Sequence, residues 1–332
     1  MDALALVGPT GTGKTAVALE LAARLGAEIV CGDSRQIFRG LDVATGKPSA
    51  AERDRCPHHL FDWLEVTEAP SAGLYARAAA PALRGIVQRG RVPLVVGGSG
   101  LYLRALVRGL APVPEIAPEV RAAVRRELEE RGPEILHAAL AELDPELADR
   151  LAPRDRQRVA RGLEVARATG RPLSAWLRDE RAARPPDCGV EGWRFVGLTD
   201  DRRRLYERLD RRAERFFEQG LLGEVHAFLD AGVPPDAPGL RSLGYAQAVA
   251  HVLRRLPYAE AVERTQRETR RYAKRQWTWW RQEGPRVGLA WVDALDRESP
   301  GALARSVEEL WRSLAATPAP GTGPGGAQGS PP

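Results

Sequence analysis

The chain carries two kinds of hydrophobic pattern, short runs that are mostly apolar and longer segments with apolar residues every three or four positions. The short runs predict buried strands of a parallel sheet, at residues 3–7, 27–31, 92–96 and 193–198. The periodic segments predict helices, at residues 16–25, 71–89, 101–107, 201–229 and 258–283. Within the second of these, Pro81 predicts a kink or restart. Strands that alternate with helices indicate an α/β fold with helices flanking a parallel sheet.

The middle of the chain departs from this alternation. Prolines at 112, 114 and 118 mark a linker, and from 119 to 183 charged and apolar residues follow helical spacing without a β-rich run. We predict three or four short helices there, forming an all-helical insertion domain over 113–192. The catalytic core would then comprise 1–112 and 193–314. Residues 315–332 are rich in Pro and Gly without apolar periodicity, so we predict a disordered tail.

The residues after the first strand fit the phosphate-binding pattern G-x-x-x-x-G-K-[ST]. They are Gly8, Pro9, Thr10, Gly11, Thr12, Gly13, Lys14 and Thr15. A strand before this P-loop and a helix after it are the context that the motif requires. Backbone N–H groups and the helix N-terminus would face phosphate oxygens, Lys14 would reach a terminal phosphate, and the Thr15 hydroxyl would ligate Mg²⁺. The sequence therefore predicts a P-loop NTPase-like sheet that binds a phosphorylated ligand.

Two further loops follow predicted strands and so belong at the same edge of the sheet. Asp33 follows the second strand as a candidate general base or metal partner, although an aspartate that caps the next turn fits equally well. The Gly-Gly-Ser-Gly turn at 97–100 lets a ligand approach the backbone closely. The adjacent His58 and His59 have no further ligands at metal spacing, so we interpret them as loop residues that pack and hydrogen-bond.

The predicted helix 258–283 is the most basic of the chain. One face carries Arg267, Arg270, Lys274 and Arg281, and its end carries Trp277, Trp279 and Trp280. Cations among aromatic residues suit nucleic acid, but large aromatic residues are often buried. We interpret the tryptophans as core and the basic face as a nucleic-acid contact. The arginine-rich turn at 155–161 fits a solvated helix face as well as a phosphate contact.

Composition narrows the class of protein only slightly. The 332 residues are 43% hydrophobic and 28% charged, as in ordinary globular proteins, and basic residues exceed acidic ones by 49 − 44 = 5. The three cysteines are widely spaced, which fits a reducing compartment and suggests neither disulfides nor a zinc site. With no apolar run of about 18 residues and no room for a signal peptide, we expect a cytoplasmic enzyme without a membrane partner.

Taken together, these motifs resemble the tRNA dimethylallyltransferase (isopentenyltransferase) family. The resemblance runs from the P-loop to about Arg281. Its further stretches are DSRQIFRGLDVATGKP at 33–48, HHL at 58–60, VGGSGLY at 96–102, QRVARGLEV at 157–165, GLLGEV at 220–225, RSLGY at 241–245 and RRYAKRQW at 270–277. The P-loop is shared by many families, whereas the second stretch combined with the basic-helix motif is specific.

The resemblance implies transfer of a dimethylallyl group from dimethylallyl diphosphate to N6 of the adenosine just 3′ of the anticodon, in tRNAs that read codons starting with U. The P-loop would hold the diphosphate with Mg²⁺ on Thr15, and the chain would act as a monomer. The implied catalytic residues are Asp33 as general base with Lys14, Thr15 and Arg212. The implied contacts to the tRNA anticodon stem-loop are Asp33, Ser34, Arg35, Gln36, Ser99, Arg121, Gln157, Arg158, Val159, Ala160, Arg161 and Arg241.

The chain departs from the family pattern at three positions. Ser99 replaces a common Thr, Phe38 replaces the usual Tyr, and Ala246 replaces an Arg that some members carry. Two other readings remain. A P-loop small-molecule or nucleotide kinase would use the same loop for ATP, and an RNA-binding protein would use it only to sense a nucleotide.

Overall fold

The computed structural model describes residues 1–179, 184–294 and 299–315. The chain divides into two compact units, one of residues 1–107 with 186–332 and one of residues 108–185. The predicted insertion domain was 113–192. The observed second unit begins five residues earlier and ends seven residues earlier. Most of the predicted disordered tail, from residue 316 onward, lies outside the described residues.

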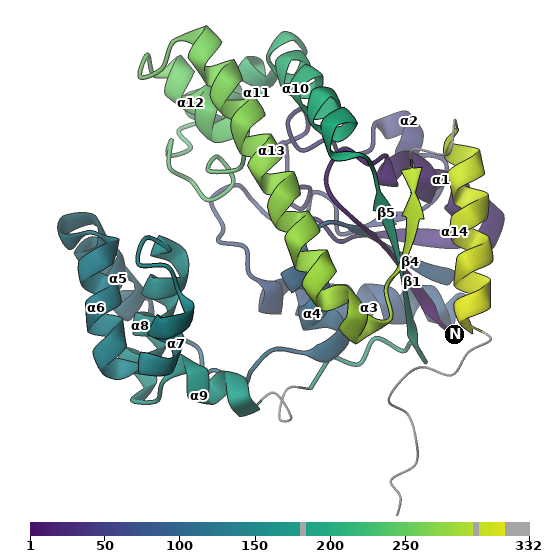
Figure 1. Cartoon of the computed structure of the whole chain (residues 1–332). Coiled ribbons are helices and arrows are strands. Elements are labelled where there is room, and N and C mark those ends of the chain that lie inside the picture. The colour runs from purple at the N-terminus through teal and green to yellow at the C-terminus, as the bar shows by residue number, and fades with distance from the viewer. Residues whose placement is uncertain (180–183, 295–298, 316–332) are drawn as a thin grey trace, which may run out of the picture. The chain divides into compact units, whose positions relative to one another are not determined.

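The larger unit is built on a six-stranded sheet with the order β3-β2-β4-β1-β5-β6, and every pairing is parallel (Figure 1). The strands are β1 (Ala3–Val7), β2 (Ala27–Cys31), β3 (His58–His59), β4 (Val92–Gly97), β5 (Trp193–Thr199) and β6 (Ala290–Asp293). Val7 lies opposite Gly97 on one side and Gly197 on the other. The central strands therefore end at one level, where the loops that follow them converge.

The four predicted strands and the α/β class are confirmed, whereas the two edge strands were not predicted. His58 and His59 hydrogen-bond as expected, but they form the edge strand β3, paired with β2, where we expected a loop. The His59 ring also hydrogen-bonds to buried Glu28 at 2.7 Å. A two-residue strand is too short to produce an alternation that a sequence pattern could show.

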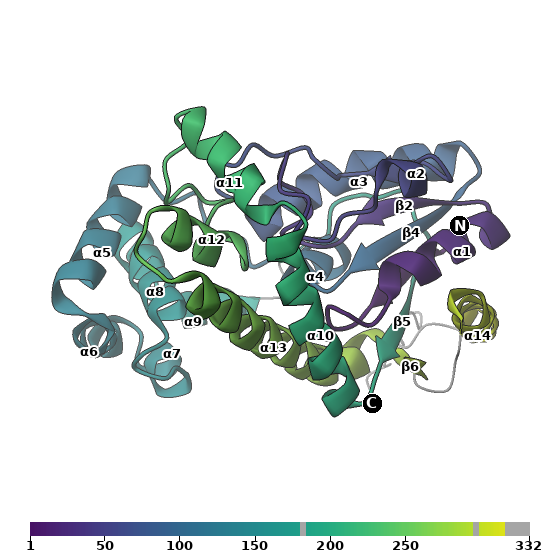
Figure 2. The same cartoon turned by 90° about the horizontal axis from the view of Figure 1, so that it is seen from above.

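Helices cover both faces of this sheet (Figure 2). On one face, α1 (Lys14–Leu25) and α14 (Pro300–Ala315) bury an apolar cluster against β1, β4 and β5. On the other face, α3 (Ala72–Gln88) contacts β2 and β4, and it stacks Tyr75 on Tyr102 of α4 (Gly100–Arg108). The helix does not restart at Pro81, because α3 continues through it. Pro81 is exposed, so the carbonyl left without a partner can bind water.

A second group of helices follows β5. They are α10 (Arg202–Glu218), α11 (Leu221–Asp230), α12 (Tyr245–Val252) and α13 (Tyr258–Glu283), while the short α2 (Ala50–Arg53) lies earlier in the chain. The single helix predicted over 201–229 is wrong, because Gly220 adopts a φ of +107° and separates α10 from α11. Long α13 packs along α10, and its final turns reach the sheet, where the Trp280 ring lies 6.1 Å from the Phe195 ring.

The smaller unit contains only helices within the described residues. They are α5 (Pro118–Arg131), α6 (Pro133–Leu143), α7 (Pro145–Arg150), α8 (Arg156–Thr169) and α9 (Leu173–Arg178), one or two more than predicted. Its core includes Val124, Leu140 and Leu163. Buried Asp144 accepts hydrogen bonds from the backbone N–H groups of Leu147 and Ser174, which joins α7 to α9. In the described part of the chain, no helix combines the length and hydropathy needed to span a membrane.

Candidate active site

The P-loop joins β1 to α1 and lies close to β5. Gly8 has a φ of +134°, and a Cβ there would overlap the carbonyl oxygen of Leu198. Only glycine fits this close approach between two backbones. Inside the loop, the Thr12 hydroxyl donates to the carbonyl of Pro9 at 3.0 Å. The loop is therefore held in a tight, defined shape at the N-terminus of α1, where backbone partial charge favours anions.

Lys14 is the first residue of α1, and its ammonium group folds back over the P-loop. Nζ donates to the carbonyls of Gly8 at 3.0 Å and Pro9 at 2.7 Å. Burial lowers the pKa of Lys14 to about 8, with the nearby Asp33 carboxylate opposing this shift and the Arg212 guanidinium adding to it. A buried cation beside a second cation gains stability from an anionic ligand.

Asp33 follows β2, and its two carboxylate oxygens have different surroundings. Oδ1 accepts the backbone N–H of Arg35 at 2.9 Å, so the aspartate does cap the following turn. Oδ2 accepts no hydrogen bond from the described residues. The capping and general-base interpretations are therefore compatible, because one oxygen orients the carboxylate and the other is open to accept a proton.

Arg212 approaches the same pocket from α10. Its guanidinium lies directly against Gly46 and 5.3 Å from the centre of the Phe216 ring. Burial lowers the pKa of Arg212, and Asp33 opposes this shift. Within the described residues it forms no ion pair. Residues that line the pocket with Arg212 include Thr10, Asp33, Thr45, Thr269 and Tyr272.

A cluster of hydroxyl groups supports the turn that follows Asp33. The Ser34 N–H donates to Ser99 Oγ at 2.8 Å, and the two serine hydroxyls are 3.0 Å apart. The phenol of Tyr272 lies near both serines, and burial raises its pKa. The Arg35 guanidinium lies 3.6 Å above the Tyr272 ring, a cation–π contact. Gln36 donates to the carbonyls of Thr45 and Gly46 at 3.1 and 3.0 Å, so it holds the loop that contains these two residues.

Three residues of this site were not identified from the sequence. Arg208 donates to the carbonyl of Gly11 at 2.8 Å and pairs with buried Asp200, which fixes the P-loop from α10. Tyr272 and Gln276 come from α13, one helical turn apart, and Gln276 Oε1 accepts the N–H of Thr10 at 2.8 Å. The sequence offered one indication of their role. Arg208 and Arg212, and likewise Tyr272 and Gln276, are spaced i, i+4 and therefore lie on one face of their helix.

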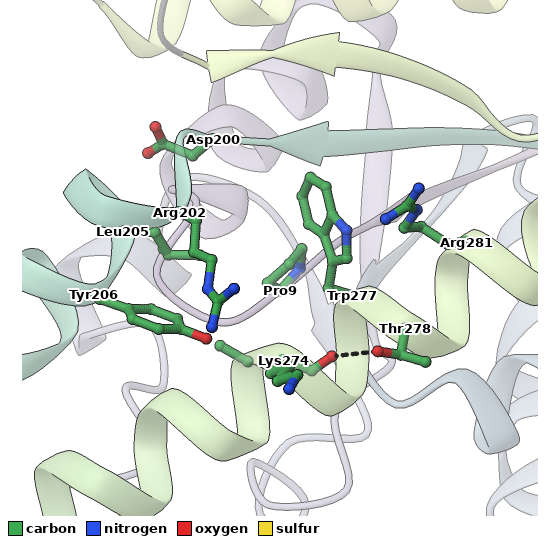
Figure 3. Close-up of a pocket in the computed structure, with 10 residues that line it drawn as sticks. Pro9, Asp200, Arg202, Leu205, Tyr206, Lys274, Trp277, Thr278 and Arg281 are labelled. Atoms are coloured by element: carbon green, nitrogen blue, oxygen red, sulfur yellow. Dashed lines mark hydrogen bonds between the residues drawn. The ribbon is translucent and has the colours of Figure 1, made fainter.

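Some side chains of the basic helix α13 are buried or paired, and others are exposed. Trp280 is buried as expected, whereas Trp277 is only partly buried. Arg270 pairs with Asp210 of α10 and is therefore not a free cation. Lys274 and Arg281 are exposed. Figure 3 shows both beside a second pocket, whose other lining residues include Pro9, Tyr206 and Trp277.

The remaining predicted RNA contacts lie on separate elements. On the helical unit, Arg121 of α5 and Gln157 and Arg158 of α8 are exposed. Arg161 pairs with Glu164 at 3.3 Å, and Ala160 is half-buried. Val159 is fully buried in the core of that unit, so its side chain stabilises α8 and is not presented to a ligand. Arg241, on the larger unit, is exposed and pairs with Asp236 at 2.9 Å.

Comparison with known proteins places this constellation in a family. The family model described as IPP transferase matches residues 36–283, and the model described as isopentenyl transferase matches residues 1–59. A tRNA dimethylallyltransferase of Parvibaculum lavamentivorans is 47% identical over 280 residues, covering 84% of this chain and 87% of the relative. One of Thermomicrobium roseum is 42% identical over 315 residues, covering 94% of this chain and 91% of the relative.

Solved structures show the same relationship. A tRNA isopentenylpyrophosphate transferase from Bacillus halodurans aligns with a TM-score of 0.66 at 32% identity, covering 95% of this chain and 96% of its own. A eukaryotic dimethylallyltransferase acting on tRNA aligns with a TM-score of 0.76 at 24% identity, covering 97% of this chain and 81% of its own, and shows the shared fold. With the P-loop, Asp33 and Arg212 gathered at one edge of the sheet, and with matches along nearly its whole length, the chain belongs to the IPP transferase family.

Proposed function

We propose that this protein is a tRNA dimethylallyltransferase, which moves the dimethylallyl group of dimethylallyl diphosphate to N6 of the adenosine 3′-adjacent to the anticodon. The proposal rests on one observation: the charged groups of Lys14, Asp33 and Arg212 lie close together at the P-loop. Two half-buried cations suit a diphosphate, and a carboxylate with one open oxygen suits the amine that attacks. The names of the relatives support the choice of tRNA as acceptor.

The leaving group sets the first chemical demand on the site. The allylic carbon–oxygen bond breaks readily only if the departing diphosphate is stabilised. Lys14 and the N–H groups of the P-loop would bind its oxygens, and Arg212 would bind from the opposite side. Arg208 holds the loop in position through the carbonyl of Gly11. Lys14 would have to turn from the carbonyls of Gly8 and Pro9 to reach the diphosphate oxygens.

The nucleophile sets the second demand. An exocyclic amine conjugated to a purine is a weak nucleophile and must lose a proton as the new carbon–nitrogen bond forms. Oδ2 of Asp33 would accept that proton, while Oδ1 keeps its hydrogen bond to the Arg35 N–H. The adenine must leave the anticodon-loop stack to reach this carboxylate, so the base is extruded into the pocket.

Mg²⁺ is part of the proposal. The Thr15 hydroxyl has no hydrogen-bond partner among the described residues, which fits a ligand position. No cluster of three or more His, Cys, Asp or Glu side chains that could hold a metal occurs in the described ranges. The ion would therefore be held by Thr15, by diphosphate oxygens and by water, as Mg²⁺ often is in P-loop proteins. When bound, it would neutralise charge on the leaving group.

Exposed cations would hold the RNA. Arg121 on the helical unit, and Lys274 and Arg281 on α13, form no ion pair within the described residues, and exposed Arg158 pairs with Asp155 at 3.6 Å. They are available to phosphates of the anticodon stem-loop, with affinity that falls as salt rises. We further propose that the protein acts as a monomer, which its mass in solution by light scattering would test.

The experiment is a single incubation of protein, Mg²⁺, dimethylallyl diphosphate and unmodified tRNA with adenosine 3′ of its anticodon. The tRNA is digested and its nucleosides are identified by mass spectrometry. Wild type should give a prenylated adenosine, and Asp33→Ala should reduce its formation by roughly 100-fold or more, as for removal of a general base. ATP turnover without a prenylated nucleoside would overturn the proposal in favour of a kinase.

A further inference from the structure

Gln276 connects the basic helix to the phosphate-binding loop. It lies on the buried face of α13 and is only 5% exposed. Its Oε1 accepts the backbone N–H of Thr10 at 2.8 Å. The backbone nitrogen can only donate, so this bond determines which end of the side-chain amide faces the P-loop. The Nε2 group must therefore point elsewhere.

That Nε2 group is a buried donor without an acceptor. It is inaccessible to solvent and has no hydrogen-bond partner within the described residues. Buried amide donors are almost always satisfied in folded proteins, because leaving one unpaired costs free energy. An unpaired donor at a ligand site indicates that the ligand supplies the missing acceptor.

The surroundings of Nε2 identify where that acceptor would lie. A Cβ on Gly98 would overlap Nε2 and would lie 3.0 Å from the carbonyl oxygen of Gly8. Gly98 follows β4, which stands between β2 and β1 in the sheet. Asp33 follows β2, and the P-loop follows β1. Nε2 therefore lies at the carboxyl edge of the sheet, beside the turn that follows β4 and the start of the P-loop.

We propose that Gln276 is a further catalytic residue with two tasks. Its Oε1 holds the tip of the P-loop, and its Nε2 donates a hydrogen bond to an oxygen of the diphosphate as the allylic carbon–oxygen bond breaks. No proton is transferred in this step, because the amide only donates a hydrogen bond. The inference rests on the proposed function for the identity of the diphosphate.

Two substitutions separate the two tasks. Gln276→Glu keeps an oxygen for the Thr10 N–H but replaces the donor with a negative charge. Gln276→Met removes both groups at similar volume. Gln266→Met is the matched control, because Gln266 lies on the same helix and, among the described residues, its side chain hydrogen-bonds only to Asp210 and Glu214 of α10. Thermal unfolding of each variant reports whether the fold is retained.

The measurement is calorimetric binding of inorganic pyrophosphate with Mg²⁺, beside kcat and KM for dimethylallyl diphosphate. Both Gln276 variants should bind pyrophosphate at least tenfold more weakly than wild type, because a hydrogen bond to a charged group is lost. Their affinity for an anticodon stem-loop RNA should stay within twofold, and the control should match wild type. A merely structural role would weaken RNA and pyrophosphate binding together.

The other outcomes are equally informative. If Gln276→Glu binds pyrophosphate as wild type does, the donor role is refuted. If Gln276→Met also binds pyrophosphate as wild type does, the role of Oε1 in holding the P-loop is refuted as well. Wild-type protein that fails to bind pyrophosphate would instead overturn the proposed function, and with it this inference.

Discussion

Gly46 lies against Arg212, and the substitution Gly46→Ala tests how closely that guanidinium must be positioned. A Cβ at Gly46 would lie 1.6 Å from Nη2 of Arg212, whereas ordinary contacts begin at 3.4 Å. The guanidinium must therefore retreat by about 1.8 Å, the difference of these two distances. Because it is the end of a flexible side chain, the fold can accommodate this movement. A misplacement of about 1 Å at a reacting centre can reduce turnover by roughly 100-fold.

We therefore expect Gly46→Ala to lower kcat for prenyl transfer by about 100-fold. The backbone φ of +62° adds a strain of roughly 1 kcal/mol, visible in urea unfolding. Gly90→Ala is the control, because Gly90 has a φ of +69° but no neighbouring atom within 4 Å. It should show the same loss of stability with unchanged kcat. Activity of Gly46→Ala within threefold of wild type would show that the position of Arg212 does not limit the reaction.

Three further predictions concern other parts of the larger unit. The pKa of Lys14 near 8 means that its positive charge is lost above that pH, so pyrophosphate affinity measured by calorimetry should fall as the pH rises from 7 to 9.5; constant affinity would contradict this. Tyr272→Phe removes the phenol hydroxyl that lies near Ser99, so kcat should fall about tenfold while RNA affinity is retained, and equal losses of both would indicate misfolding. Glu28→Gln weakens the charged hydrogen bond from Arg89, which holds the pKa of Glu28 below its usual value. Urea unfolding at pH 7 should show that the variant loses roughly 1–3 kcal/mol of unfolding free energy. This difference between variant and wild type should disappear as the pH falls through the lowered pKa of Glu28.

Sequence patterns predicted the parts of the fold that repeat over many residues. Mostly apolar runs identified β1, β2, β4 and β5, because strands buried on both faces need apolar residues at most positions, with Glu28 in β2 and Arg194 in β5 as exceptions. They did not identify β3 or β6, which are short edge strands. The division of 201–229 into two helices depends on the backbone of Gly220, and a glycine within a periodic helix does not by itself predict a break.

The candidate site was predicted in part for a similar reason. Lys14 and Asp33 follow strands directly, so the parallel topology alone brings them to one edge. Arg208 and Gln276 reach the P-loop from helices nearly 200 or more residues away, and only tertiary packing shows what they contact. Val159 shows the converse, because its place in a matched motif carried no information about its burial.

The order of strands in the sheet has a consequence for how the protein is made. β1 pairs with β4 on one edge, but its other partner, β5, begins 190 residues after β1 does. The whole helical unit is synthesised between them. At roughly 5–20 residues per second, the free edge of β1 stays open for roughly 5–20 s after β4 emerges from the ribosome. During that interval the nascent chain exposes an apolar strand edge that could pair with another chain. Because β5 is made late, we expect any need for chaperones during synthesis to arise from the larger unit.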